Sequence, residues 1–194
     1  MAHTREMSGE THADAEARWH GTRVRLLAGD ITQVSVDAIV NAANSALAGG
    51  GGVDGAIHAA AGPSVLAELR ERYRGCPTGS AVITGGGELP ARFIVHTVGP
   101  VWQGGGHDEA RLLASAYAAS LDRASEVGAT SIAFAAISCG VFGYPLDEAA
   151  DVALSAVRTW LGTHPGATID EIVFVLRGAD VMSAFRGALQ RQRH

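Results

Sequence analysis

Lysine is absent from this chain, and all 15 of its basic residues are arginines. The absence excludes a Walker-type phosphate loop, which needs a lysine to reach the phosphates, and it also excludes Schiff-base and Ser-Lys chemistry. The only cysteines are Cys76 and Cys139, too few for a disulfide framework or a tetrahedral zinc set. We therefore expect no metal or other cofactor, and a reducing, cytoplasmic location.

Long apolar runs and runs of basic charge are lacking as well. No apolar stretch reaches membrane-spanning length, and residues 1–20 are too polar to hold the apolar part of a secretion signal. The 15 basic and 20 acidic residues give a net charge of −5, and no basic run could follow a nucleic-acid backbone. We expect no membrane partner and no nonspecific binding to nucleic acid.

The length and the apolar content indicate one domain. The chain has 194 residues, 47% of them hydrophobic, which is enough for a single core. Residues 1–20 show no sustained periodicity and are predicted to form a flexible tail, so the folded domain is expected to span residues 21–194. Apolar runs and helical periodicity predict strands at 24–29, 37–43, 80–84, 91–98, 131–138 and 171–176, and helices at 53–60, 64–73, 108–126, 145–160 and 179–190.

The alternation of these elements predicts an α/β fold. Most of the strands are apolar on both faces, which favours a central, largely parallel sheet covered by helices on both sides. Such sheets bind ligands outside the carboxyl ends of their strands. Three polar or glycine-rich segments are expected there: residues 29–32, 41–55 and 138–144. Together they predict one cleft with an acidic acceptor, two anion-holding backbones and an aromatic side chain.

The segment from Asn41 to Gly55 holds two asparagines, four consecutive glycines and one aspartate. A loop keeps such glycines where its backbone comes very close to a ligand or takes positive φ, and converging N–H groups favour a phosphate. A flexible hairpin or linker is the alternative. The match of these glycines to G-x-G-x-x-G is weak evidence for a dinucleotide fold, because Rossmann glycines follow their strand immediately.

Six segments, in register from about Arg23 to the C-terminal helix, resemble the macrodomains. More narrowly, the chain is similar to the MacroD-type branch and to the bacterial O-acetyl-ADP-ribose deacetylases. The segments are GDIT at 29–32, DAIVNAAN at 37–44, GGGGVDGAIH at 49–58, CPTG at 76–79, HTVGP at 96–100 and ISCGVFGYP at 137–145. The resemblance implies a three-layer α/β/α macrodomain with a mixed sheet, and ADP-ribose as the ligand.

The resemblance also assigns roles along the cleft. Asp30 would accept a hydrogen bond from the adenine amine beside the Ile31 backbone, although a carboxylate here also suits a helix cap. Asn44 would bind the distal ribose, while Asn41 would tie down the loop backbone. Phe142 would lie against the distal ribose or simply pack in its loop. The residues that would hold the diphosphate, mainly by backbone N–H groups, are Gly51, Gly52, Val53, Ser138, Cys139, Gly140 and Val141.

Asp54 matches the carboxylate that the family associates with hydrolysis. Water must attack either the ester carbonyl of O-acetyl-ADP-ribose or the glycosidic carbon of ADP-ribose esterified to an acidic side chain. Free aspartate, with a pKa of about 3.9, is a weak base at neutral pH. Asp54 is therefore expected to act as a base or to orient water and ribose. A carboxylate that only stabilises the start of a helix is the alternative.

Other residues carry weaker signals. Cys139 stands where this branch commonly has threonine, and it is expected to be a passive small residue rather than a nucleophile paired with His58 or His96. His96 lies inside an apolar strand and is expected to be a core histidine. Trp102, beside Gly104 to Gly106, either lines a flap or packs in the core. Ala135 replaces a common proline, and Gly85 to Gly87 replaces an aromatic-containing turn.

Two functional classes follow. The first is a hydrolase that removes mono-ADP-ribose from acidic side chains of proteins, deacetylates O-acetyl-ADP-ribose, or does both. The second is a noncatalytic reader of ADP-ribose or of ADP-ribosylated protein. The presence of both Asn44 and Asp54 favours the enzyme, because binding alone needs only the loops and Asp30. A generic nucleotide or RNA-binding module is a third class, which the net charge disfavours.

Overall fold

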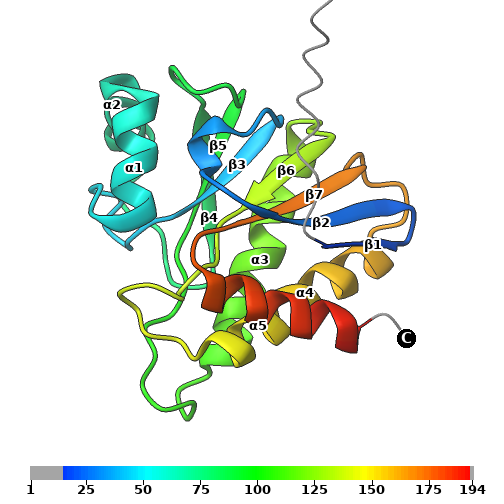
Figure 1. Ribbon diagram of the computed structural model, residues 1–194. Helices are drawn as coiled ribbons and strands as arrows, with labels where there is room; N and C mark the ends of the chain where they lie inside the picture. Colours follow the sequence, from blue (N-terminus) through cyan, green and yellow to red (C-terminus); the bar gives the residue numbers. More distant parts are fainter. Residues whose placement is uncertain (1–14, 193–194) are drawn as a thin grey trace, which may run out of the picture.

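The computed structural model describes residues 15–192, which form one sheet between two layers of helices (Figure 1). The strands are β1 (Ala15–Trp19), β2 (Thr22–Ala28), β3 (Ala38–Ala42), β4 (Ala81–Gly85), β5 (Phe93–Thr97), β6 (Ser131–Phe134) and β7 (Glu171–Leu176). The helices are the 3-10 helix η1 (Ile31–Gln33) and α1 (Gly52–Ala61), α2 (Pro63–Arg72), α3 (Glu109–Glu126), α4 (Leu146–Thr163) and α5 (Ala179–Arg191).

The sheet is mixed and largely parallel, as predicted. Its strand order is β1-β2-β7-β6-β3-β5-β4. Only the two edge strands run antiparallel to their neighbours, β1 beside β2 and β4 beside β5. Helices α1 and α2 cover one face, and α3, α4 and α5 cover the other (Figure 1). The three-layer α/β/α architecture is therefore confirmed.

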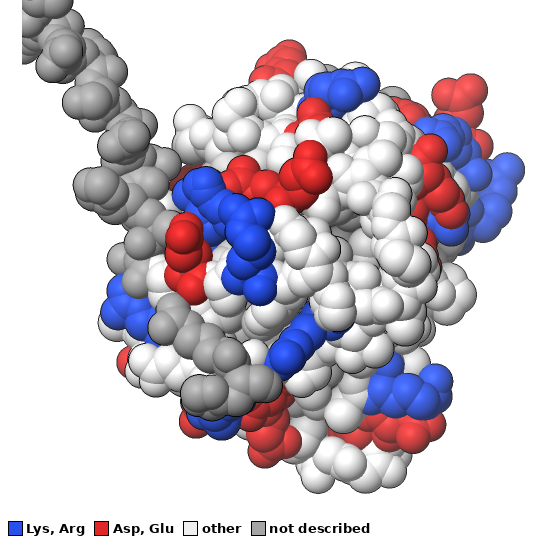
Figure 2. Space-filling model, turned by 90° about the vertical axis from the view of Figure 1, so that its right-hand side faces the viewer, with Lys and Arg blue, Asp and Glu red and all other residues white. Residues whose placement is uncertain are grey.

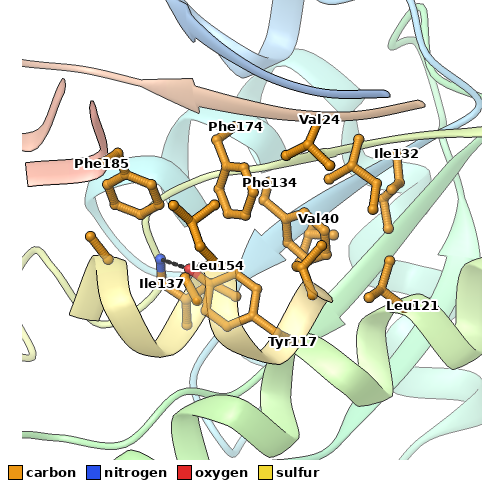
Figure 3. Packing of buried hydrophobic residues seen from close by; sticks show 14 of the residues in the cluster. Val24, Val40, Tyr117, Leu121, Ile132, Phe134, Ile137, Leu154, Phe174 and Phe185 are labelled. Carbon is orange, nitrogen blue, oxygen red and sulfur yellow. Dashed lines mark hydrogen bonds between the residues drawn. The ribbon is translucent and has the colours of Figure 1, made fainter. Parts of the chain in front are cut away.

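Both faces of the inner strands are buried, which explains why these strands read as continuous apolar runs. Ile39 packs under α1 and α2, whereas its neighbour Val40 points into the larger core below α3, α4 and α5. Figure 3 shows part of that larger core, where the rings of Phe134 and Phe174 stack with centroids 5.5 Å apart. This rigid centre fixes the strand ends on which the candidate site is built.

The prediction that residues 1–20 form a flexible tail is wrong for residues 15–19. Ala15–Trp19 form strand β1, which pairs with β2 from Ala15 opposite Leu26 to Trp19 opposite Thr22. In AEARW, small or aromatic residues alternate with charged ones, a period-two pattern that indicates a half-buried strand. Five residues are short enough for this signal to escape a search for sustained periodicity. Residues 1–14, the rest of the predicted tail, lie outside the described residues.

Two predicted boundaries near the second loop also differ. The strand predicted over 131–138 ends at Phe134, because the chain turns there into the loop that carries Ser138 with a positive φ of 64°. Pro145 precedes helix α4 as its cap rather than standing in its first turn, and the helix runs on to Thr163. Both differences lengthen the irregular segment at the carboxyl end of β6, where a ligand-binding loop belongs.

The surface shows no broad area of one charge on the face drawn in Figure 2, where acidic and basic side chains are interspersed. Arg25 on β2 and Glu171 on β7 form an ion pair, with Nε and Oε1 2.9 Å apart. Within residues 15–192, no helix combines the length and apolar character that crossing a bilayer requires.

Candidate functional site

A cleft of about 350 Å³ opens at the carboxyl ends of the parallel strands. Six predicted site residues line it: Asp30, Ile31, Gly52, Val53, Cys139 and Gly140; the other six, Asn44, Gly51, Asp54, Ser138, Val141 and Phe142, stand outside its lining. They come from three segments far apart in the sequence, which confirms the prediction that these loops share one cleft. A larger hollow of about 740 Å³ lies between α3 and α4 and contains none of the predicted site residues.

Asp30 closes the end of the cleft beside β2. Its Oδ1 accepts hydrogen bonds from the backbone N–H of Thr32 at 2.9 Å and from the Thr32 hydroxyl at 2.8 Å, so the side chain caps η1. These hydrogen bonds, the backbone one first, lower the pKa of the Asp30 carboxyl. The capping role is thus confirmed. The second carboxylate oxygen of this exposed side chain is left to accept from an adenine amine, and that role stays a prediction.

The glycine loop leads directly into α1. Gly49 and Gly52 have positive φ values of 79° and 58°, and Gly51 precedes the first helical residue. The first N–H groups of a helix have no partner within it, and here Gly52 and Val53 present that end of α1 to the cleft. An anion placed there meets backbone donors and the positive end of the helix dipole, which needs no lysine.

Of the roles predicted for Asn44 and Asn41, only that of Asn41 is contradicted, and the binding of the distal ribose by Asn44 stays a prediction. Asn44 Nδ2 donates to the carbonyl of Gly49 at 2.9 Å, and its Oδ1 accepts from the Ala48 N–H at 3.2 Å. Asn44 is therefore the residue that ties down the loop backbone. The prediction that Asn41 does so is wrong, because this fully buried side chain donates to the Asp54 carboxylate instead.

Asp54 stands in the first turn of α1 with only 5% of its surface exposed. Its Oδ1 accepts from Asn41 Nδ2 at 2.6 Å and lies 3.4 Å from His58 Nε2. Its Oδ2 faces Gly50, where an added Cβ would stand 3.1 Å away. One oxygen is therefore held from behind, while the other points toward the glycine loop. The sequence signal for His58 was available, since position i+4 on a helix lies beside position i.

His96 is fully buried and hydrogen-bonded, which confirms the prediction of a core histidine. Its Nδ1 lies 3.1 Å from Asn41 Nδ2, and its Nε2 lies 2.9 Å from the Thr84 hydroxyl. Burial, and secondarily the neighbouring His58, lower the pKa of His96 from 6.5 to about 3. The imidazole is therefore neutral in the folded protein at neutral and mildly acidic pH.

This lowered pKa predicts acid sensitivity of the fold. The unfolded chain takes up a proton at His96 below pH 6.5 and the native state does not, so this contribution to stability is present above pH 6.5 and lost toward pH 3. Linkage gives a loss of about 2 kcal/mol between pH 7 and pH 5. Urea unfolding of wild type and His96→Gln at both values measures it. The variant should lose less stability than wild type, and equal losses would contradict the assignment.

The second loop approaches the cleft from the carboxyl end of β6. The backbone N–H of Ile137 donates to the hydroxyl of the buried Tyr117 at 3.3 Å, which anchors the loop to the core (Figure 3). Ser138 is buried, and its Oγ finds no partner among the described residues. Val141 is almost completely exposed. Phe142 is half-buried, and its carbonyl accepts from the Trp102 N–H at 2.8 Å.

Cys139 lines the cleft as a thiol. Burial raises its pKa to about 11, and its Sγ lies 3.5 Å from the Ile137 carbonyl. A thiol with so high a pKa supplies almost no thiolate at neutral pH, and the thiolate is the nucleophile. We expect Cys139→Ala to keep ester turnover within about twofold of wild type, measured as initial rates at pH 7.5. A loss of tenfold or more would restore the nucleophilic alternative.

Trp102 is packed rather than loose. Its ring lies against that of Tyr144 with centroids 4.6 Å apart, and the following loop is tied to the buried carboxylate of Glu109. That carboxylate accepts from the backbone N–H groups of Gln103, Gly105 and His107 at 3.0, 3.0 and 2.6 Å. The packing interpretation of Trp102 is therefore confirmed.

Several cleft residues escaped sequence reasoning. Arg177 and Val175 reach the cleft from the end of β7, and Val181 reaches it from α5. Strand β7 lies beside β2 in the sheet although almost 150 residues separate them in the chain. Only the strand order could have revealed this neighbour. Arg177 adds a positive charge close enough to Asp30 to lower the pKa of its carboxyl slightly.

Comparison with known proteins is consistent over most of the chain. A family model described as Macro domain matches residues 40–153. An O-acetyl-ADP-ribose deacetylase of Escherichia fergusonii is 54% identical over 157 residues, which cover 79% of this chain and 88% of that protein. The O-acetyl-ADP-ribose deacetylase of Citrobacter rodentium is 48% identical over 174 residues, which cover 88% and 97%.

Solved structures agree with the fold described above. An Oceanobacillus iheyensis macrodomain with ADP is 38% identical, has a TM-score of 0.85, and is matched over 91% of this chain and 95% of that one. A Trypanosoma brucei macrodomain in complex with ADP-ribose is 41% identical, with a TM-score of 0.79 over 86% of this chain and 68% of that one.

Proposed function

We propose that this chain, which belongs to the macrodomain family, binds ADP-ribose and is a hydrolase that deacetylates O-acetyl-ADP-ribose. Two relatives that are about 50% identical to this chain are named O-acetyl-ADP-ribose deacetylase. The observation that carries the proposal is the first turn of α1, where the anion-binding backbone of Gly52 and Val53 is followed directly by the Asp54 carboxylate. A pyrophosphate held by the first group brings a sugar ester close to the second.

The reaction needs a water molecule, a base beside that water, and groups that hold the diphosphate of the substrate. Water adds to the acetyl carbonyl, the bond from that carbon to the ribose oxygen breaks, and acetate and ADP-ribose leave. Asp54 Oδ2, on the side of Gly50, orients this water, accepts its proton as the new bond forms, and returns the proton to the ribose oxygen as that oxygen leaves. The α1 N-terminus and the second loop hold the diphosphate, and Asp30 accepts from the adenine amine.

We propose in addition that the protein removes mono-ADP-ribose from acidic side chains of proteins. The linkage is again an ester of the distal ribose, and Gly140 at the cleft is followed by the almost completely exposed Val141. ADP-ribosylated proteins would then be partners as well as ADP-ribose and its small esters. The two unpaired cysteines, Cys76 and Cys139, support action in the reducing cytoplasm.

Calorimetry with ADP-ribose, together with assays of acetate release from O-acetyl-ADP-ribose and of ADP-ribose release from a glutamate-modified protein, tests the proposal. ADP-ribose at 100 times its Kd should stabilise the fold by about 2.7 kcal/mol, and AMP at the same concentration by much less. Binding without release of either product would support the reader. Absence of binding at millimolar ADP-ribose would overturn both functions.

A further inference from the structure

A line of buried polar side chains runs behind Asp54 across three neighbouring strands. Asn41 lies on β3, His96 on β5 and Thr84 on β4. Asn41 and His96 stand opposite each other in the parallel register of β3 and β5. Each of the three side chains is at most 1% exposed. Three adjacent polar groups in an otherwise apolar layer are unfavourable to bury, so most of their polar atoms are expected to have hydrogen-bond partners.

The hydrogen bonds along this line have only one consistent direction. The Thr84 hydroxyl donates to the Gly85 carbonyl at 3.0 Å, so its oxygen is left to accept from His96 Nε2, 2.9 Å away. The proton of the neutral imidazole is thereby placed on Nε2, and Nδ1 becomes an acceptor. Asn41 Nδ2 supplies the matching N–H at 3.1 Å and donates its second one to Asp54 Oδ1 at 2.6 Å.

The direction of this chain decides which way the Asn41 amide faces. In the reversed amide, Oδ1 would meet a carboxylate oxygen and the lone pair of His96 Nδ1, so both contacts would be repulsive. The amide keeps its observed orientation even though its buried Oδ1 has no partner among the described residues. An unpaired buried acceptor destabilises the folded state. The network therefore satisfies the Asp54 carboxylate at the expense of one hydrogen bond to the Asn41 oxygen.

We propose that Thr84 and His96 are positioning residues for hydrolysis: Thr84 selects the tautomer of His96, His96 orients Asn41, and Asn41 aims the Asp54 carboxylate at the attacking water. The inference rests on the proposed function, because Asp54 must act in turnover for its orientation to matter. None of the three strand residues lines the cleft. Their effect should therefore appear in the rate of the chemical step and not in ligand binding.

Thr84→Val tests the first link, because valine has nearly the same shape as threonine but cannot accept the His96 proton. A carboxylate that is slightly misplaced can lose one to two powers of ten in rate, so kcat should fall about tenfold or more with KM within twofold. Thr84→Ser keeps the hydroxyl and should restore kcat to near the wild-type value. Thr22→Val is the matched control, because Thr22 is also a buried strand residue whose hydroxyl donates to a carbonyl, that of Ile169.

Nitrogen-15 NMR of the histidine rings provides a readout that does not depend on activity. Wild type and Thr84→Ser should show His96 protonated on Nε2, and Thr84→Val should shift the proton toward Nδ1 or broaden both signals. An active wild type whose Thr84→Val variant keeps full kcat would overturn the inference while leaving the proposed function intact. An Nδ1-protonated His96 in wild type would overturn it as well. An inactive wild type that binds ADP-ribose would instead refute the proposed hydrolase.

Discussion

Asp54→Asn should lose between about 100- and 10,000-fold in turnover of O-acetyl-ADP-ribose, the range that removal of a general base commonly produces. The substitution keeps the shape of the side chain, and the new amide oxygen can still accept from Asn41 Nδ2. What disappears is the charge and the basic oxygen that faces Gly50. The Kd for ADP-ribose should stay within a few fold, because the diphosphate is held by backbone groups of the two loops.

Single-turnover rates and calorimetry on the same preparations separate the two effects. Asp151→Asn is the control, because Asp151 is an exposed carboxylate on α4 that pairs with Arg191 and does not line the cleft. It should leave both quantities unchanged. If Asp54→Asn turned over the ester at the wild-type rate, Asp54 would be only a helix-stabilising carboxylate and the hydrolysis would need another base.

Local chemistry in the sequence predicted most of the fold. Strand β7 occurs at 171–176 as its uninterrupted apolar run indicated, and α1, α2, α3 and α5 begin and end within two residues of the predicted positions. These elements are long or strongly patterned, so their periodicity outweighs the context. Strand β1 was missed because its pattern is only five residues long, and its stability comes from pairing with β2.

The candidate site was predictable where one segment supplies several groups. Asp30 with Ile31 and Gly52 with Val53 line the cleft, and each pair is adjacent in the sequence. Contacts across strands were not predictable in this way. Which of the two nearby asparagines contacts Asp54 depends on which one faces α1, and that follows from the strand pleat: Asn41 is the last but one residue of β3 and points under the helix.

The same distinction explains why the contacts of His96 and Arg177 could be identified only from the structure. His96 meets Asn41 only because β3 and β5 are neighbours in register. Arg177 meets the cleft only because β7 lies beside β2. The local pattern of a segment does not show which strand lies beside it, and residue separation along the chain does not determine strand order. The roles of the individual residues in binding ADP-ribose stay predictions.

Gly55→Ala should weaken ADP-ribose binding by roughly 10- to 100-fold, because the added methyl group forces the glycine loop away from α1. A Cβ on Gly55 would stand 2.5 Å from the carbonyl oxygen of Gly50, a backbone atom that cannot rotate aside. Overpacking of this kind typically costs about 1–3 kcal/mol, and here the loop is the softer partner. Moving Gly50 also disturbs the space in front of Asp54 Oδ2, so turnover should fall together with affinity.

Gly106→Ala provides the matched control, since a Cβ there meets no heavy atom within 4 Å. Calorimetry should give the wild-type Kd for this control and a raised Kd for Gly55→Ala, while thermal unfolding should show both variants folded. Gly55 contributes no side chain to the apolar layers that hold the sheet, so the fold should survive the displaced loop. A Gly55→Ala variant with wild-type affinity would mean that the diphosphate does not depend on the glycine loop, and the proposed binding mode would then be wrong.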